Sequence, residues 1–340
     1  MREPAMNALS SKRSIPSCEH GWSVTCASAN ARPTSTPEVH MIDITRRNAL
    51  MGTAALVLSG CVGRTAHAAD LHERLGAIER AAGGTLGAYV LDTASGEGTG
   101  WRQDERFAQC SSFKLSLAAL ALHLQEAGEI TLNERIAFTK ADLLQHSPVT
   151  SQNLDTGMTI GELAQATMVT SDNAAANLLL HRFGGPERLT AFWRALGDDT
   201  SRLDRYEPEL NDVPPGEIRD TTTPVAAAHT LARLLTDNAL REPSRDTLIR
   251  WMIAVETGGK RLRAGLPAGW RAGDKTGTGI GQTNATYVDI GWFELPSGQM
   301  VVVTSYFRPG KITGTIDPGA EFALAEVGRV AADWAMEQRS

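Results

Sequence analysis

Short apolar runs bounded by turn residues lie near both ends of the chain. Thr85–Asp92 and Thr99–Arg102 are predicted to be the strands of one hairpin, and Thr286–Glu294 and Met300–Phe307 those of another. The stretch Lys275–Gly279, just before the second pair, is predicted to be an edge strand. The two ends of the chain therefore contribute to one sheet.

Helical spacing dominates the rest of the chain. A first helix is predicted to end at Gly83, and its apolar face holds Leu71, Leu75, Ile78 and Ala82. A capping box, Thr159-x-x-Glu162, predicts the start of another helix. Further helices are predicted at Asp172–Phe183, Pro224–Asp237, Ser244–Ile253 and about Pro318–Met336. The middle of the chain is therefore nearly all helical.

These elements predict an α/β (α+β) fold with two lobes. Residues 70–109 and 254–340 form a sheet lobe with flanking helices, and residues 110–253 form an inserted, all-helical lobe. Residues 70–340 together make the predicted folded domain. Ligand sites favour interfaces between lobes, and the chain passes from the first lobe to the second near Ser111.

Composition narrows the function. The 340 residues carry a formal net charge of −6 and no basic patch, which argues against a nucleic-acid partner. Cys110 is the only cysteine in the predicted domain, so an internal disulfide is excluded there. The histidines show no ligand-like spacing, and we expect no metal site.

The first 69 residues are predicted to be outside the folded domain. Residues 41–69 resemble an export signal, because Arg46-Arg47 precedes a short run rich in Ala, Leu and Val. The paired arginines favour the twin-arginine route and a periplasmic location. Cleavage is expected after Ala68; the alternative is a lipobox that leaves a lipid anchor on Cys61. Residues 1–40, which precede a second start at Met41, are predicted to be a non-structural extension.

One stretch stands out chemically. Ser111 precedes a run, Leu115–Leu122, that is apolar on all sides and predicts a helix buried on every face. Lys114 lies one turn beyond Ser111, so its amine shares a face with the hydroxyl. A desolvated lysine can accept the proton of a serine nucleophile. The alternative is a capping serine with a lysine that reaches solvent.

Two more short motifs follow in the chain. Ser171-Asp172-Asn173 begins a predicted helix and reads either as a cap or as a proton-relay hydroxyl with a substrate-binding amide. Lys275-Thr276-Gly277 reads either as a turn in a solvated strand or as a carboxylate grip, with glycine allowing close approach of a ligand.

The order Ser-x-x-Lys, Ser-Asp-Asn, Lys-Thr-Gly resembles the motif set of class A β-lactamases and penicillin-binding proteins, from about Leu71 to the C-terminus. The resemblance implies an antiparallel five-stranded sheet beside the helical lobe. It also implies a small-molecule β-lactam substrate and no cofactor. We expect a monomer.

A polar, proline-rich segment favours the β-lactamase branch. Arg205–Asp220 could be pinned at its ends by an ion pair, as a compact Ω-loop is. It resembles the class A Ω-loop, in which a glutamate at the place of Glu207 and an asparagine at the place of Asn211 hold a water. Pro208 then permits a cis Glu–Pro bond. The alternative for Glu207 is a solvated carboxylate.

Three further positions carry the resemblance less directly. Asn284 occupies the usual place of an arginine that assists the substrate carboxylate, so Arg261 is expected to substitute; the alternative is a surface arginine. His146 stands where the family often has an aromatic wall, or is merely an exposed histidine. Cys110 faces a position, here Gly279, that completes a disulfide in some members, so that bridge is expected to be missing.

The resemblance implies a two-step acyl transfer. Ser111 attacks the lactam, Lys114 or Glu207 through water takes its proton, and Ser171 protonates the leaving nitrogen. Glu207 then activates the water that releases the product. The backbone N–H groups of Ser111 and Thr278 would form the oxyanion hole. Substrate binding is assigned to Asn173, Asn211, Lys275, Thr276, Gly277, Thr278, Arg261 and His146.

Two other functions share this motif set. A D-alanyl-D-alanine peptidase would use Ser111, Lys114, Ser171 and Lys275 without a deacylating Glu207. A β-lactam sensor would become acylated and stay so. Persistence of the acyl adduct distinguishes both from a hydrolase.

Overall fold

The computed structural model describes residues 69–338. The predicted export signal, with Arg46-Arg47, Cys61 and the site after Ala68, lies outside the described residues. The extension 1–40 does so too.

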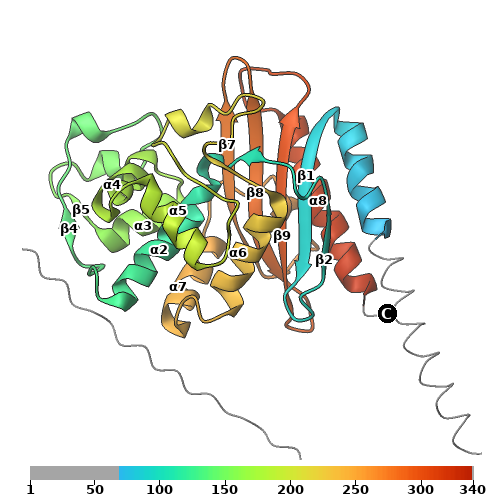
Figure 1. Cartoon of the computed structure of the whole chain (residues 1–340), viewed down its shortest axis with the longest axis horizontal. Helices are drawn as coiled ribbons and strands as arrows, with labels where there is room; N and C mark the ends of the chain where they lie inside the picture. Colours follow the sequence, from blue (N-terminus) through green and yellow to red (C-terminus); the bar gives the residue numbers. More distant parts are fainter. Residues whose placement is uncertain (1–68, 339–340) are drawn as a thin grey trace, which may run out of the picture. The chain divides into compact units, whose positions relative to one another are not determined.

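A five-stranded antiparallel sheet has the strand order β2-β1-β9-β8-β7 (Figure 1). Its strands are β1 Gly84–Asp92, β2 Gly98–Trp101, β7 Ala272–Ile280, β8 Ala285–Glu294 and β9 Met300–Pro309. β1 pairs with β9 along its whole length, from Gly84 opposite Pro309 to Asp92 opposite Val301. The prediction that both ends of the chain form one sheet is confirmed, with β7 at its edge.

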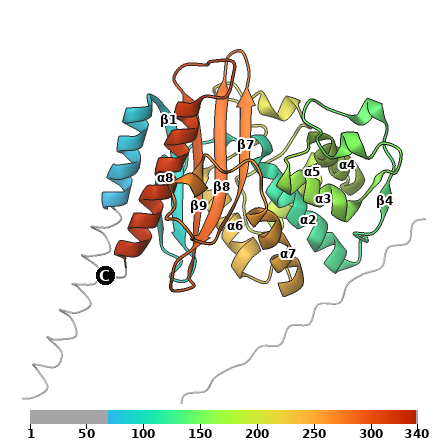
Figure 2. The ribbon, with the colours of Figure 1, turned by 180° about the vertical axis from the view of Figure 1, so that it is seen from behind.

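Alternate residues of the central strands enter two separate cores. Leu86, Ala88 and Val90 of β1 pack with α8 (Pro318–Glu337) and with the helical residues 69–82. Tyr89 and Leu91, which point to the opposite face, join the core of the helical lobe. Figure 2 shows α8 and the first helix covering their side of the sheet. The sheet is therefore buried on both faces, which explains its nearly continuous apolar strands.

The remaining helices lie on the side of the sheet's other face (Figure 1). These are α2 Phe113–Ala127, α3 Ile160–Val169, α4 Asn173–Phe183, α5 Pro186–Ala195, α6 Pro224–Thr236 and α7 Glu242–Ile253. Of these, α6 and α7 pack directly against the strands. The short strands are β3 Phe107–Ala108, β4 Arg135–Ile136, β5 Met158–Thr159 and β6 Thr221–Thr222. Single 3₁₀ turns are η1 Cys110–Ser112, η2 Lys140–Asp142, η3 Thr150–Gln152, η4 Glu209–Asn211 and η5 Leu262–Gly265. The predicted capping box of Thr159 and Glu162 begins α3.

The predicted buried helix is α2. Every residue from Phe113 to Leu122 is buried. Ser111 lies in η1, one turn before α2 rather than in its first turn. The first helix departs from its prediction at Ala82, which is exposed because the helix ends there and Gly83, with φ of 67°, turns the chain into β1.

Candidate active site

A cleft of about 790 Å³ brings the sequence motifs together. It is lined by residues of η1, α4, the Ω-loop and β7, among them Ser111, Ser171, Asn173, Glu207, Asn211, Arg261, Thr276, Gly277 and Thr278. A second cavity of about 820 Å³ shares His146, Asn173, Asn211 and Thr278 with the first. The two cavities therefore share a wall and lie side by side.

Ser111, Lys114 and Glu207 form a closed triangle. The Lys114 Nζ lies 2.9 Å from the Ser111 Oγ and 3.0 Å from the Glu207 Oε1. The Ser111 hydroxyl donates to the same Glu207 oxygen at 3.2 Å. Lys114 and Glu207 are buried, whereas Ser111 is partly exposed in the cleft. The hydroxyl is thus the one member of the triangle that a ligand can reach easily.

The Lys114 ammonium is held on several sides. It also donates to the Ser171 carbonyl at 2.9 Å and to the Asn173 Oδ1. Burial lowers the pKa of Lys114, while the charge of Glu207 opposes that shift. The alternative of a lysine reaching solvent is wrong, because none of this side chain is exposed. Because burial favours the neutral form of the amine, Lys114 can accept the proton of the Ser111 hydroxyl 2.9 Å away.

Ser171 and Lys275 form a second polar pair. The Lys275 Nζ donates to the Ser171 Oγ at 3.0 Å and to the Thr276 carbonyl at 2.7 Å. Burial lowers the pKa of Lys275 to about 7, and the positive charge of Lys114 adds to the effect. Capping of α4 is performed by Asp172, whose carboxylate accepts from the Ala175 N–H at 2.9 Å. The Ser171 hydroxyl therefore serves no cap.

Arg261 is buried beside β7 at the wall of the cleft, and the surface alternative is wrong. Its Nη1 donates to the carbonyls of Gly277 and Val288, each at 2.9 Å. Its Nη2 donates to the Thr278 Oγ1 at 2.7 Å. The guanidinium thus lines the cleft and donates to a hydroxyl of the same wall. Asn284 instead closes the turn after β7, where its carbonyl accepts from the Gly281 N–H at 2.8 Å.

Two glycines of β7 face the turn that carries Ser111. A Cβ at Gly277 would lie 3.0 Å from the Ser111 N and the Gln109 O. A Cβ at Gly279 would lie 3.0 Å from the Cys110 Sγ. Cys110 is a free, fully buried thiol whose pKa burial raises to about 12. Among residues 69–338 Cys110 is the sole cysteine, and Gly279 is the residue that faces it.

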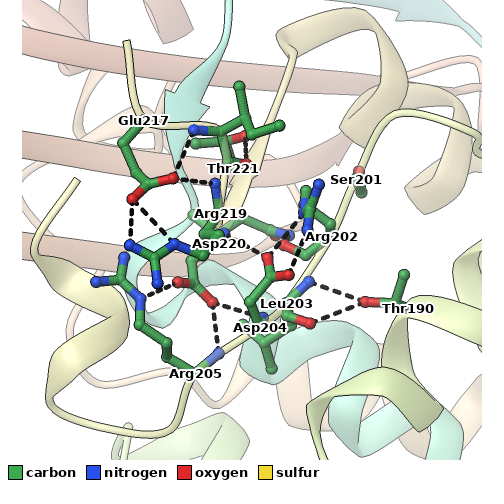
Figure 3. Close-up of polar contacts among 12 residues, drawn as sticks. Thr190, Ser201, Arg202, Leu203, Asp204, Arg205, Glu217, Arg219, Asp220 and Thr221 are labelled. Carbon is green, nitrogen blue, oxygen red and sulfur yellow. Dashed lines mark hydrogen bonds and ion pairs between the residues drawn. The ribbon is translucent and has the colours of Figure 1, made fainter. Parts of the chain in front are cut away.

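The ends of the Ω-loop are joined by carboxylates that bind backbone N–H groups (Figure 3). The Asp220 Oδ1 accepts from the Asp204 and Arg205 N–H groups at 2.7 and 3.0 Å. The Asp204 Oδ2 accepts in return from the Asp220 N–H at 3.1 Å. The predicted ion pair joins the Arg205 Nε to the Asp220 Oδ2 at 2.5 Å. Both ends of the loop are therefore fixed to each other.

Glu207 is oriented inside this loop by two asparagines. Asn211 donates from its Nδ2 to the Glu207 Oε2 at 2.6 Å. Asn177, which the sequence analysis missed, accepts from the Glu207 N–H at 3.0 Å and donates to its carbonyl at 2.8 Å. A signal existed, since Asn177 lies four residues after Asn173 on one helix and therefore on the same face. The predicted cis bond between Glu207 and Pro208 is present. The alternative of a solvated Glu207 is wrong.

Two residues at the rim complete the cleft. His146 is exposed and lines both cavities, so it is at once an exposed histidine and part of the wall. Its carbonyl accepts from the Asn173 N–H at 2.8 Å. Thr257, also missed, meets the Thr276 hydroxyl at 2.5 Å. Nothing in the local sequence around Thr257 indicated this contact.

Metal chemistry has no evident site in the described part of the chain. Among residues 69–338 no group of three His, Cys, Asp or Glu side chains is placed to hold an ion. In the same residues no helix is long and apolar enough to cross a membrane.

Comparison with known proteins identifies the family. The Beta-lactamase enzyme family model matches residues 70–335. Beta-lactamase OXY-1 of Klebsiella oxytoca is 43% identical over 266 residues, which cover 78% of this chain and 90% of OXY-1. An ancestral (GNCA) class A β-lactamase has a similar structure, with a TM-score of 0.74 and 48% identity over 77% of this chain and 99% of its own. The chain belongs to the class A β-lactamases.

A further relative agrees with this assignment. Beta-lactamase L2 of Stenotrophomonas maltophilia is 43% identical over 281 residues, which cover 81% of this chain and 91% of L2. The family model matches residues 70–335 of the described residues 69–338. This β-lactamase therefore has the family's fold over essentially all of the described residues.

Proposed function

We propose that this β-lactamase opens the lactam ring of penicillin- and cephalosporin-type antibiotics through an acyl-enzyme on Ser111, and so confers resistance to them. The observation that carries the proposal is the triangle of Ser111, Lys114 and Glu207, in which a hydroxyl lies within hydrogen-bond distance of both an amine and a carboxylate. Either neighbour can receive the proton of the attacking oxygen.

Acylation follows from these contacts. The Ser111 Oγ bonds to the lactam carbonyl carbon and loses its proton to Glu207 or Lys114. The hydrogen bond of 3.2 Å from the Ser111 hydroxyl to Glu207 lets the proton pass directly to the carboxylate. The sequence analysis expected this transfer to go through a water. The C–N bond of the ring then breaks, and Ser171 protonates the departing nitrogen. Lys275, which donates to the Ser171 Oγ, supplies a proton to that hydroxyl in turn.

Deacylation is assigned to Glu207 and Asn211. The Glu207 carboxylate has one oxygen bound to Lys114 and the other to Asn211. A water held by these groups loses a proton to the carboxylate and attacks the ester carbonyl. The ester C–O bond then breaks, and the Glu207 carboxyl returns the proton to the Ser111 oxygen. This step, which the buried carboxylate supports, favours a hydrolase over a peptidase or a sensor.

Substrate binding is assigned to the walls of the cleft. The carboxylate of the substrate contacts Lys275, Thr276 and Thr278. Arg261 donates to the Thr278 hydroxyl. Gly277, which has no side chain, lets the substrate approach the backbone of β7 closely. Asn173 and Asn211 contact the side-chain amide of the substrate. The backbone N–H groups of Ser111 and Thr278 form the oxyanion hole, where one donor is typically worth about 3–4 kcal/mol in the transition state.

Export is part of the proposal. The segment 41–69 would carry the chain to the periplasm by the twin-arginine route, where the enzyme acts as a monomer. Cleavage after Ala68 releases it, whereas lipidation of Cys61 is the alternative. Fractionation of cells with an Arg46→Lys, Arg47→Lys variant tests the route, and unchanged export would refute it.

Mass spectrometry after addition of penicillin tests the mechanism. The wild type should release product within seconds and carry no lasting adduct, whereas Ser111→Ala should form no adduct and lose turnover by at least about 10⁴-fold. Ser112→Ala, next to it, is the matched control and should stay active, because its hydroxyl bonds the Gln109 carbonyl instead. Retained activity in Ser111→Ala, or a lasting wild-type adduct, would contradict the proposal.

A further inference from the structure

Tyr287 lies on β8, the strand next to the substrate-binding strand β7. It is directly opposite Thr278 of β7. Residues opposite each other in an antiparallel pair have their side chains on the same face. Only 1% of Tyr287 is exposed, and its hydroxyl and its ring contact two different segments, the loop before α8 and Arg261.

The hydroxyl of Tyr287 brackets one residue of the loop before α8. It accepts from the Asp317 N–H at 2.8 Å and donates to the Thr315 carbonyl at 3.2 Å. A phenol can do both at once, since it carries one donor and acceptor lone pairs. The residue between these two contacts is Ile316, so the backbone on both of its sides is tied to one atom of the sheet.

The ring of Tyr287 lies against Arg261. The guanidinium carbon is 5.6 Å from the ring centroid, close enough for a cation–π contact. The same guanidinium donates to the Thr278 hydroxyl. Tyr287 thus connects the loop that holds Ile316 with the side chain assigned to the substrate carboxylate.

Ile316 is an apolar side chain at the mouth of the cleft. It is 50% exposed and lines the same cavity as Ser111, Thr276 and Arg261. It does not line the neighbouring cavity. A single exposed isoleucine needs no explanation by itself. The tie to Tyr287 on both sides is what distinguishes Ile316 from an ordinary surface residue.

We infer that Ile316, held in place by the positioning residue Tyr287, is an apolar wall that selects the ring substituent next to the substrate carboxylate. In a cephalosporin the carbon adjacent to the carboxylate-bearing carbon carries a variable group. A carboxylate bound at Thr276 and Thr278 directs that group along the side of the cleft where Ile316 lies. A flat aromatic substituent would lose its water there against the isoleucine, and a methyl group would not reach.

This inference rests on the proposed function, and its test compares two cephalosporins that share one acyl side chain. One carries a methyl group and the other an arylthiomethyl group on the carbon beside the carboxylate-bearing carbon. Ile316→Ser should lower the ratio of kcat/KM for aryl over methyl about fivefold, through KM for the aryl substrate, and Ile316→Leu should restore it. Phe322→Ser is the matched control, because Phe322 is 65% exposed but lines a different groove.

Tyr287→Phe tests the positioning role, since it removes both loop contacts and keeps the ring beside Arg261. The aryl-over-methyl ratio should fall about threefold while kcat for the methyl substrate stays constant. Equal losses for both substrates, or an unchanged ratio in Ile316→Ser, would overturn the inference. Neither result would touch the proposed function, which fails separately if the wild type does not turn over the methyl substrate.

Discussion

The two walls of the cleft are built from different interactions. β7 is paired with β8 from Ala272 opposite Phe293 to Ile280 opposite Ala285, so a backbone ladder holds the substrate-binding wall. The Ω-loop, which carries Glu207, contains only the short η4 turn and is held by side chains that bind backbone N–H groups. Many backbone hydrogen bonds hold β7 in place, whereas the conformation of the Ω-loop depends on the side chains of a few carboxylates and asparagines. The loop should therefore be more sensitive to single substitutions.

Within the two walls, the largest expected effect comes from Glu207, which is buried near the start of the Ω-loop. Glu207→Ala should trap the acyl-enzyme and lower turnover about 10³-fold, because it removes the carboxylate that activates water. Mass spectrometry of the adduct with time checks this. Glu209→Ala, an exposed glutamate of the same loop, is the control and should be normal. Normal turnover in Glu207→Ala would show that the role given to Glu207 is wrong.

Loss of Asp220, which joins the two ends of the Ω-loop, should lower activity less than loss of Glu207 but should lower stability more. Asp220→Ala leaves two N–H groups and Arg205 without their partner, so we expect about 3 kcal/mol less stability to urea. Deacylation should slow about 100-fold, since a shift of about 1 Å in Glu207 is enough. Arg219→Ala, which breaks only the exposed pair with Glu217, should change neither. If Asp220→Ala and Arg219→Ala behave alike, the contacts of Asp220 do not position Glu207.

A matched change in the sheet wall should be milder and act on the other step. Gly277→Ala would place a Cβ 3.0 Å from the Ser111 N, so β7 must move by a few tenths of an ångström. Acylation should slow about tenfold, with deacylation little changed. Single-turnover kinetics separates the two steps. A selective effect on deacylation would contradict the division of labour between the walls.

The smallest effect concerns the charge of Lys275. Its pKa is lowered to about 7 by burial, so the free enzyme loses this charge as pH rises through that value. KM for a carboxylate-bearing substrate should rise about threefold between pH 6.5 and 7.5. The unfolded chain keeps the proton up to its ordinary pKa, so this group destabilises the fold most at low pH, and stability should rise between about pH 7 and 10. A KM that stays flat in this range, against a flat Lys275→Arg control, would show that Lys275 keeps its proton.

Much of the site could be predicted from its residues because local order carried the signal. Ser111 and Lys114 meet across one turn, and Asp172 caps the helix that follows Ser171. The Ω-loop ion pair was also readable, since arginine and aspartate close a polar, proline-rich segment. Thr257 and Tyr287 were not predicted, because their contacts join segments whose approach depends on how β7, β8 and the loop before α8 pack together.

By itself the sequence determined most of the long strands and helices, although not α5, that both chain ends enter one sheet, and which short motifs carry chemistry. Periodicity, caps and turn residues are local, so a single chain displays them. Only the tertiary structure decided that Arg261 is buried next to Thr278, that Glu207 reaches Ser111 directly, and that Tyr287 holds the loop of Ile316. Those three contacts join residues 17 to 96 positions apart in the sequence, and their distances follow from packing, which no local pattern encodes.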